Sequence, residues 1–323
     1  MKMIKILSIG VIATLMFAGC GFNGKDTSDM GSDISSGISK VESDMGSEMS
    51  KLESDMSSNS SGSMSNSNSS VEAPISGASS DIATEIHVTP GAIDLQKLDN
   101  KLQGWGQGVQ LDDKNRPISS VKYQEKYGKY DAYFIGKEEK VIYLTFDEGY
   151  ENGYTAPILD TLKEKNVPAV FFVTMDYAER EPELLRRMVD EGHVIGNHSD
   201  NHVSYPTVTV EKCEEETMNL HNYILENFGC EMTLLRPPKG EFSERVLAQM
   251  QQLGYKTLLW SYAYKDWEVD NQMEPSVALE KLNGALHDGA IYLLHAVGST
   301  NNEILGDFID YAQSQGYQFK LFK

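Results

Sequence analysis

The chain has 323 residues and a formal net charge of −20 at pH 7, and 40% of its residues are apolar. An acidic balance of this size argues against nucleic acid as a partner, because a phosphate backbone requires a basic face. It also argues against loose attraction to anionic lipid, although an anionic polymer held in a local cleft remains compatible with it. The length allows about two domains, and the apolar residues suffice for one sizeable core.

The first twenty residues resemble an export signal. Lys2 and Lys5 precede an apolar run over 6–18 that is too short to span a bilayer comfortably. The ending Ala-Gly-Cys20 resembles the lipobox of bacterial lipoproteins, which implies cleavage before Cys20 and a lipid on its sulfur, although Phe17 stands where that pattern usually has Leu. An ordinary cleaved signal peptide and an uncleaved anchor are the alternatives. All three imply export, and lipidation anchors the chain to the outer face of the cytoplasmic membrane.

Two segments precede residue 140. Residues 21–90 are dominated by Ser, Gly, Asp, Asn and Met, and this composition predicts a disordered acidic spacer that holds the rest of the chain off the membrane. A repeat within it, SKVESDM at 39–45 and SKLESDM at 50–56, leaves a transient helical coil open as an alternative. Residues 91–139 are more apolar and predict an N-terminal extension that packs on the main domain, with a short strand in YDAYFIG.

From residue 140 onward, strand-like and helical segments alternate. Continuous apolar runs predict strands at 141–146, 169–174, 193–197, 232–235, 255–260, 290–294 and 317–322. Helical periodicity predicts helices at 154–165, 183–191, 208–228, 244–253, 275–287 and 302–315. Apolar strands that alternate with helices indicate an α/β domain with a parallel sheet covered by helices. Periodicity does not separate a barrel from a doubly wound sheet.

Cys213 and Cys230 are the two cysteines beyond the leader. Cys213 lies within a predicted helix and Cys230 just after its end, so at 1.5 Å per residue they are ~25 Å apart. This separation exceeds the reach of a disulfide and predicts two unpaired thiols.

Five predicted strands are each followed by a reactive side chain: Asp147, His198, Arg236, Asp266 and His295. The carboxyl ends of parallel strands meet at one edge, where α/β folds build their sites. Taken singly, the aspartates could cap helices, the arginine could brace a turn, and His198 with His202 could be surface imidazoles. Their convergence at one edge argues for a single site. The other histidines fit no such pattern and are assigned structural roles: His87, His193, His221 and His287.

The motifs around these residues resemble a known family. TFDEG, HSDNH, RPPKG, DW and LLH are similar to the five ordered motifs of the family-4 carbohydrate esterases, the polysaccharide deacetylases with a NodB-like domain. The strings TFDEGYENG, GNHSDNH, RPPKGEFSE, LGYKTLLWSYAYKDW and YDAYFIG resemble more closely the sporulation-type muramic-δ-lactam N-deacetylases of spore-forming bacteria. The resemblance implies a distorted (β/α) barrel over 140–323. It also implies hydrolysis of the N-acetyl group of peptidoglycan muramic acid lacking its peptide, on the pathway to muramic-δ-lactam in spore cortex.

The resemblance assigns the chemistry to four side chains. It makes Asp147 the general base that takes a proton from water and His295 the general acid that protonates the leaving amine. It makes His198 and His202 ligands of a divalent metal, expected to be Zn, with Co, Mn or Mg as alternatives.

The remaining family positions have supporting roles by the same resemblance. Arg236 would pair with Asp147, and Asp266 would hold Arg236. The expected substrate-side residues are Lys239, whose backbone N–H would stabilise the oxyanion, Leu293, which would line the acetyl pocket, and Trp267 and Pro238.

One position departs from the family. Glu148 stands where most members have a second Asp as third metal ligand, and its side chain is one methylene longer. It could reach the ion or point to solvent. Two other functions stay open: deacetylation of N-acetylglucosamine or another glycan, and a catalytically silent lipoprotein that binds the wall. A monomer acting on glycan strands is expected in the leading interpretation.

Overall fold

The computed structural model describes residues 93–322. The predicted signal peptide, the lipidation site Cys20 and the predicted spacer over 21–90 lie outside the described residues. Among the helices in the described part, none is both long enough and apolar enough to cross a membrane.

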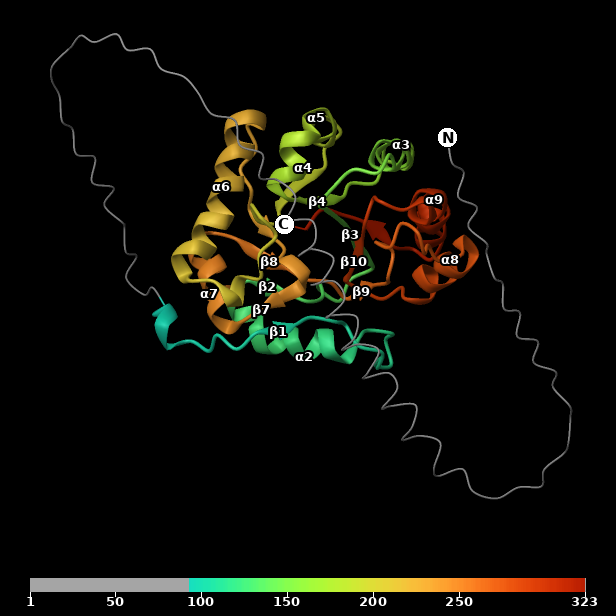
Figure 1. Cartoon of the computed structure of the whole chain (residues 1–323). Helices are drawn as coiled ribbons and strands as arrows, with labels where there is room; N and C mark the ends of the chain where they lie inside the picture. Colours follow the sequence, from blue (N-terminus) through green and yellow to red (C-terminus); the bar gives the residue numbers. More distant parts are fainter. Residues whose placement is uncertain (1–92, 323) are drawn as a thin grey trace, which may run out of the picture. The chain divides into compact units, whose positions relative to one another are not determined.

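Every strand and helix expected after residue 140 has a counterpart in the structure (Figure 1). The strands are β1 (Gln103–Gly104), β2 (Ala132–Tyr133), β3 (Val141–Glu148), β4 (Val170–Val173), β5 (Val194–Asn197), β6 (Leu234–Leu235), β7 (Glu241–Phe242), β8 (Lys256–Leu258), β9 (Tyr262–Ala263), β10 (Ala290–Leu294) and β11 (Gln318–Phe319). The α-helices are α2 (Ile118–Tyr127), α3 (Thr155–Lys165), α4 (Met175–Arg180), α5 (Pro182–Asp190), α6 (Val210–Phe228), α7 (Glu244–Gln252), α8 (Pro275–Gly284) and α9 (Ser299–Ser314). Sequence periodicity did not predict α2 or α4, which are short and carry few apolar residues.

The main sheet is parallel and curled. Its strands follow the order β2-β8-β6-β5-β4-β3-β10-β9, and β11 adds to the start of β3. Within the described residues β2 and β9 are the two ends of this order and do not pair with each other, so the sheet is a half-barrel rather than a closed one. The prediction of a distorted (β/α) barrel is confirmed in this open form.

Both faces of the sheet are buried, which explains why its strands read as continuous apolar runs. Adjacent residues of a strand point to opposite faces. In β4, Phe171 joins the core beneath the helices, where it stacks on Phe146 with ring centroids 5.1 Å apart. Its neighbour Phe172 joins a second core on the other face.

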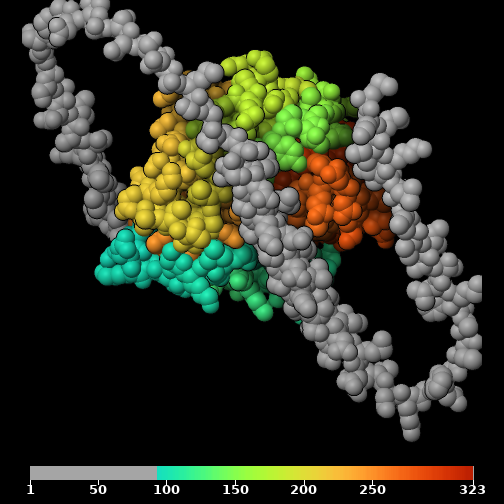
Figure 2. Space-filling view, in the orientation of Figure 1, coloured from blue at the N-terminus to red at the C-terminus, as the bar shows by residue number. Residues whose placement is uncertain are grey.

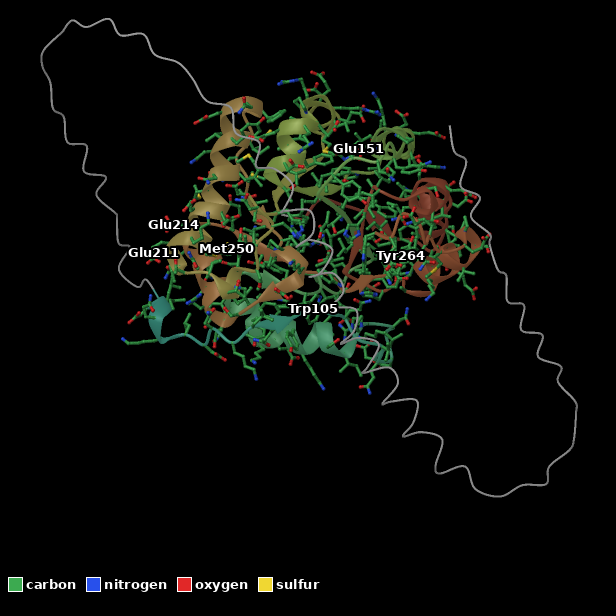
Figure 3. All side chains as sticks on the ribbon, viewed as in Figure 1. Trp105, Glu151, Glu211, Glu214, Met250 and Tyr264 are labelled. Carbon is green, nitrogen blue, oxygen red and sulfur yellow. The ribbon has the colours of Figure 1, made fainter. Side chains whose placement is uncertain are left out.

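The second core is completed by the segment that precedes β3. Trp105, in this segment, donates its backbone N–H to the Gly240 carbonyl (3.0 Å) and its indole N–H to the Trp260 carbonyl (2.9 Å). Its ring lies edge-on to Phe134, with centroids 4.6 Å apart. Figure 2 shows the segment as a band beside α6, and Figure 3 labels Trp105 near α2. The segment therefore braces the loop after β6 and the end of β8.

Residues 213 and 230 behave as expected. Cys213 is buried, Cys230 is half-buried, and both are free thiols. Burial raises the pKa of the Cys213 thiol to about 12, which keeps it protonated and unreactive. The prediction of two unpaired cysteines is confirmed.

Replacing Trp105 by Ala tests the bracing role of the N-terminal segment. The change removes a buried ring and the hydrogen bond to Trp260, so the free energy of unfolding should fall by about 3–5 kcal/mol. Leu102→Ala is the matched control, since Leu102 is 40% exposed on the same segment and should cost about 0.5 kcal/mol or less. Urea unfolding of both variants measures the difference. If Trp105→Ala lowered the free energy of unfolding as little as Leu102→Ala, the segment would not be part of the cooperative unit.

Candidate active site

The site is organised around a buried ion pair between Asp147 and Arg236. Asp147 lies near the end of β3, and Arg236 follows β6 directly. Arg236 is fully buried, and its Nη1 donates to Asp147 Oδ1 at 2.7 Å and to Thr145 Oγ1 at 2.9 Å. Thr145 and Asp147 both reach the same guanidinium because alternate residues of a strand share a face.

Carbonyl and ring partners satisfy the rest of the Arg236 guanidinium. Nε donates to the Leu258 carbonyl at 2.9 Å, and the guanidinium carbon lies 4.3 Å from the centre of the Phe172 ring. Phe172 can occupy this place because residue 196 is glycine. A Cβ on Gly196 would approach Phe172 Cδ1 to 2.4 Å, so any side chain at 196 would displace the ring under the arginine.

The ion pair sets the charge of Asp147. Burial alone would raise the pKa of this carboxyl, but the Arg236 guanidinium, with smaller contributions from His198 and His295, holds the pKa below its ordinary value. Asp147 is therefore ionised at neutral pH and can accept a proton through Oδ2, the oxygen not bonded to Arg236.

His198 presents a lone pair to the site. Burial lowers its pKa to about 4, so the imidazole is neutral at neutral pH. Its Nδ1 lies 2.8 Å from the Arg236 carbonyl, which can only accept, so Nδ1 carries the hydrogen and Nε2 carries the lone pair. This Nε2 lies 3.6 Å from Asp147 Oδ2, and the rings of His198 and His202 are 4.9 Å apart.

The loop that carries both histidines is held in an unusual backbone conformation. Ser199 and His202 have positive φ angles of 71° and 54°, a region that side chains other than glycine adopt only when the surroundings enforce it. The Asn201 backbone N–H and side-chain amide donate to the two carboxylate oxygens of Glu216, at 2.7 and 3.0 Å. Glu216 is a fully buried residue of α6. Glu216 holds the loop in place through these two hydrogen bonds.

A second charged pair joins Asp266 to His295. Asp266 lies in the loop after β9, and its Oδ1 lies 2.7 Å from His295 Nδ1 while its Oδ2 accepts the His295 backbone N–H at 2.8 Å. Burial would lower the pKa of His295, but the Asp266 carboxylate and, further away, Asp147 outweigh this and raise it. His295 is thus biased toward the protonated form.

This arrangement corrects one sequence-based expectation. Asp266 was expected to hold Arg236, but its carboxylate instead binds His295 and the side chain of Asn301. The physical reason is placement. Asp266 follows β9, which pairs with β10, and His295 follows β10 directly, so the two meet across neighbouring strand ends.

The expected substrate-side residues lie around the same strand ends. Trp267 is half-buried, with its ring centroid 5.7 Å from that of His295. Leu293 is buried on β10 and is the register partner of Thr145, so both face the second core. Pro238 is buried, and Lys239 next to it has a positive φ of 59°. Their roles toward a substrate stay predictions.

Glu148 does not share the face of Asp147. Its register partner is Val173 of the helix-side core, whereas that of Asp147 is Phe172 of the second core. Glu148 is fully buried, and neither carboxylate oxygen has a hydrogen-bond partner in the described part of the chain. Burial, then the negative charge of nearby acids, raises the pKa of Glu148 well above its ordinary value, which favours the protonated form.

The donor set fits a metal ion in part. His198 Nε2 and Asp147 Oδ2 are both unprotonated electron-pair donors facing each other, an arrangement that a cation between them would stabilise, and His202 lies alongside. Within residues 93–322, however, no group of three His, Cys, Asp or Glu side chains is placed to hold a metal. Glu148 therefore does not complete a three-ligand set with His198 and His202 in this conformation.

Sequence reasoning missed three residues that support the site: Phe172, Glu216 and Asn301. Phe172 reads as an ordinary buried residue of an apolar strand, and Glu216 and Asn301 read as polar positions on amphipathic helices. No sequence signal distinguishes them, because their contacts come from segments far apart along the chain.

Comparison with known proteins agrees with this geometry. The model of the polysaccharide deacetylase family matches residues 135–258. The peptidoglycan-N-acetylmuramic acid deacetylase PdaA of Bacillus subtilis is 41% identical over 232 residues, which cover 71% of this chain and 88% of that protein. Its solved structure gives a TM-score of 0.66 over 69% of this chain and 96% of that chain, at 41% identity.

Two further solved structures are similar to this chain, one at higher and one at lower sequence identity. A family 4 carbohydrate esterase from Bacillus anthracis is 40% identical, with a TM-score of 0.58 over 69% of this chain and 95% of that chain. BA3943 of Bacillus anthracis, described as a CE4 family pseudoenzyme, is 26% identical, with a TM-score of 0.55 over 58% and 66% of the two chains. The fold is thus compatible with active and inactive sites, and the site residues must decide between them.

Asp266→Asn tests the electrostatic coupling to His295. Removing the carboxylate charge removes the main contribution that raises the pKa of His295, so this pKa should fall by roughly one to three pH units. The protonated form would then be lost at lower pH than in the unaltered chain. A titration of the His295 ring followed by NMR measures the shift, with the signal assigned from a His295→Gln variant.

The control for this experiment is Asp307→Asn, which removes an equal charge from an exposed position on α9. It should leave the His295 titration unchanged. If both variants moved the titration equally, net charge rather than the Asp266 contact would set the pKa.

Proposed function

Because the chain belongs to the polysaccharide deacetylase family, we propose that it hydrolyses the N-acetyl group of peptidoglycan amino sugars. The observation that carries the proposal is the pairing of an ionised Asp147 with a histidine, His295, that is biased toward its protonated form. Amide hydrolysis needs a base for water and an acid for a poor leaving group. One site here holds both.

Asp147 supplies the base. Arg236 keeps its carboxylate ionised and fixes it through Oδ1, so Oδ2 faces the site and takes the proton of the attacking water. His295 supplies the acid and donates its Nε2 proton to the departing amine, while Asp266 fixes the ring through Nδ1. The backbone N–H of Lys239 is the proposed donor to the oxyanion.

His198 and His202 are the residues that would hold a divalent metal, with zinc expected and cobalt, manganese or magnesium as alternatives. Deacetylases of this family are generally metal-dependent. The ion, when bound, polarises the amide carbonyl and makes the attacking water more acidic. The neutral state of His198, with its Nε2 lone pair directed toward Asp147, supports this assignment.

We propose N-acetylmuramic acid without its peptide as the substrate, on the pathway to muramic-δ-lactam in spore cortex. The support is the 41% identity to PdaA, a peptidoglycan-N-acetylmuramic acid deacetylase, over 71% of this chain and 88% of that protein. In a spore-forming host, loss of the chain should remove muramic-δ-lactam from the cortex.

Acetate release tests the reaction and the base together. The full chain, incubated with Zn²⁺ and glycan strands of peptidoglycan stripped of peptide, should release acetate, and a chelator should abolish the release. Asp147→Asn keeps the size of the side chain but removes the base, so kcat/KM should fall by about 100-fold or more. Asp176→Asn, at an exposed ion pair with Arg180, should leave the rate unchanged.

The outcomes separate the competing functions. Release from N-acetylglucosamine oligomers but not from peptide-free muramic acid would move the substrate to N-acetylglucosamine. No release with any divalent metal would favour a silent wall-binding protein. An unchanged rate of acetate release by Asp147→Asn would refute the assignment of Asp147 as the base.

We further propose that the chain is exported and held at the outer face of the membrane by a lipid on Cys20, where it can reach the wall. The support is the sequence of residues 1–20. Labelled fatty acid should be incorporated into the chain in a bacterial host and lost in Cys20→Ser, while Cys230→Ser keeps the label. Labelling of both variants alike would contradict lipidation at Cys20.

A further inference from the structure

Asn301 is buried at the start of α9 and touches both members of the His295–Asp266 pair. Its Nδ2 donates to Asp266 Oδ2 at 2.5 Å and to the His295 backbone carbonyl at 3.0 Å. Its Oδ1 accepts a hydrogen bond from the Tyr264 hydroxyl. Tyr264 lies on the side of the domain near α8 (Figure 3). The buried side chain is thus placed where it can act on the pair.

The orientation of the amide follows from its partners. Asp266 Oδ2 and the His295 carbonyl can only accept, so they require the NH₂ group, and both of its hydrogens are used. The remaining Oδ1 then needs a donor, which the Tyr264 hydroxyl provides. A flipped amide would set its oxygen against two acceptors, so only one orientation satisfies every polar atom of Asn301.

We propose that Asn301 is a positioning residue that fixes the His295–Asp266 pair and draws part of the Asp266 charge away from the imidazole. Its role in the reaction rests on the proposed function, because it acts through the acid His295. Its effect on the pair does not depend on that function.

The Asp266 carboxylate shares its negative charge among three hydrogen-bond donors. Asp266 Oδ1 faces His295 Nδ1, while Oδ2 accepts from the Asn301 amide and from the His295 backbone N–H. A hydrogen bond to a carboxylate stabilises its negative charge, so each donor weakens the pull of Asp266 on the imidazole proton. The other charged groups near His295 are Asp147 and Arg236, which do not involve Asn301.

This moderation serves an acid catalyst. An acid held too tightly by its carboxylate partner gives up its proton slowly, and efficiency is highest when its pKa lies near the working pH. Asp266 raises the pKa of His295, and Asn301 limits that rise.

Asn301→Leu is the test, with the His295 titration by NMR in the full chain as the readout. Losing the amide leaves more of the Asp266 charge on the imidazole, so the pKa of His295 should rise, by roughly 0.3 to 1 pH units. Asp266→Asn must move it in the opposite direction. An unchanged or lowered pKa in Asn301→Leu would overturn the proposal, because a loosened loop weakens the contact and cannot raise the pKa.

Two further variants keep the test decisive. Tyr264→Phe removes only the hydroxyl that polarises and orients the amide, so it should raise the pKa of His295 by a smaller amount, and it decides the matter if Asn301→Leu does not fold. No rise in Tyr264→Phe would then overturn the proposal. Asn302→Leu, the same change at the half-buried neighbouring position, should leave the titration unmoved.

Activity gives a separate readout. If the proposed function holds, Asn301→Leu should lower kcat for acetate release with KM within about twofold, because the acid acts after the substrate has bound. A chain that releases no acetate but shows the expected shifts in the NMR titration would refute the proposed function and leave the inference about the pair standing.

Discussion

The structure of the site depends on burying the Asp147–Arg236 ion pair. A fully buried guanidinium loses its hydration, and the loss is tolerable only if every N–H finds a partner and the counter-charge lies close. The carbonyls of Leu258, at the end of β8, and of Leu259, directly after it, meet these needs together with the Thr145 hydroxyl and the Phe172 ring. Gly196 follows from the same constraint, since it makes room for the ring. The hydrogen bond from the Trp105 indole N–H to the Trp260 carbonyl braces the strand end whose carbonyls the arginine binds.

The two charged pairs hold two titrating groups in opposite states. Asp147 is kept deprotonated by a cation, and His295 is biased toward protonation by an anion, at strand ends that belong to one sheet edge. A base and an acid that work on the same amide must be in these states at the same pH. The pairs achieve this by electrostatics that are already in place before the substrate arrives.

The sequence predicted the strands after residue 140, their parallel sheet covered by helices, and the edge where the reactive residues gather. These features could be predicted because apolar runs and strand-end positions are local. It did not predict which partner each side chain finds. Asp266 was expected to bind Arg236 but binds His295. This contact depends on the pairing of β9 with β10, two strands that are separated by α8 along the chain. The contacts of Glu216 and Asn301 have the same origin: a polar residue on a helix shows its partner only once the helix is packed.

Glu148 shows why the identity of a residue and its position in a motif are not enough to assign it as a metal ligand. Asp147 and Glu148 are adjacent carboxylates on one strand, yet the strand directs them to opposite faces. Their surroundings shift the pKa values of the two carboxyls in opposite directions. Asp147 faces a guanidinium, which holds its pKa below the ordinary value. Glu148 faces an apolar core, where burial and nearby acids raise its pKa well above the ordinary value. A raised pKa disfavours the ionised carboxylate, which is the form that binds a metal. Binding an ion would require Glu148 to leave the core, so its extra methylene matters less than the face on which β3 places it.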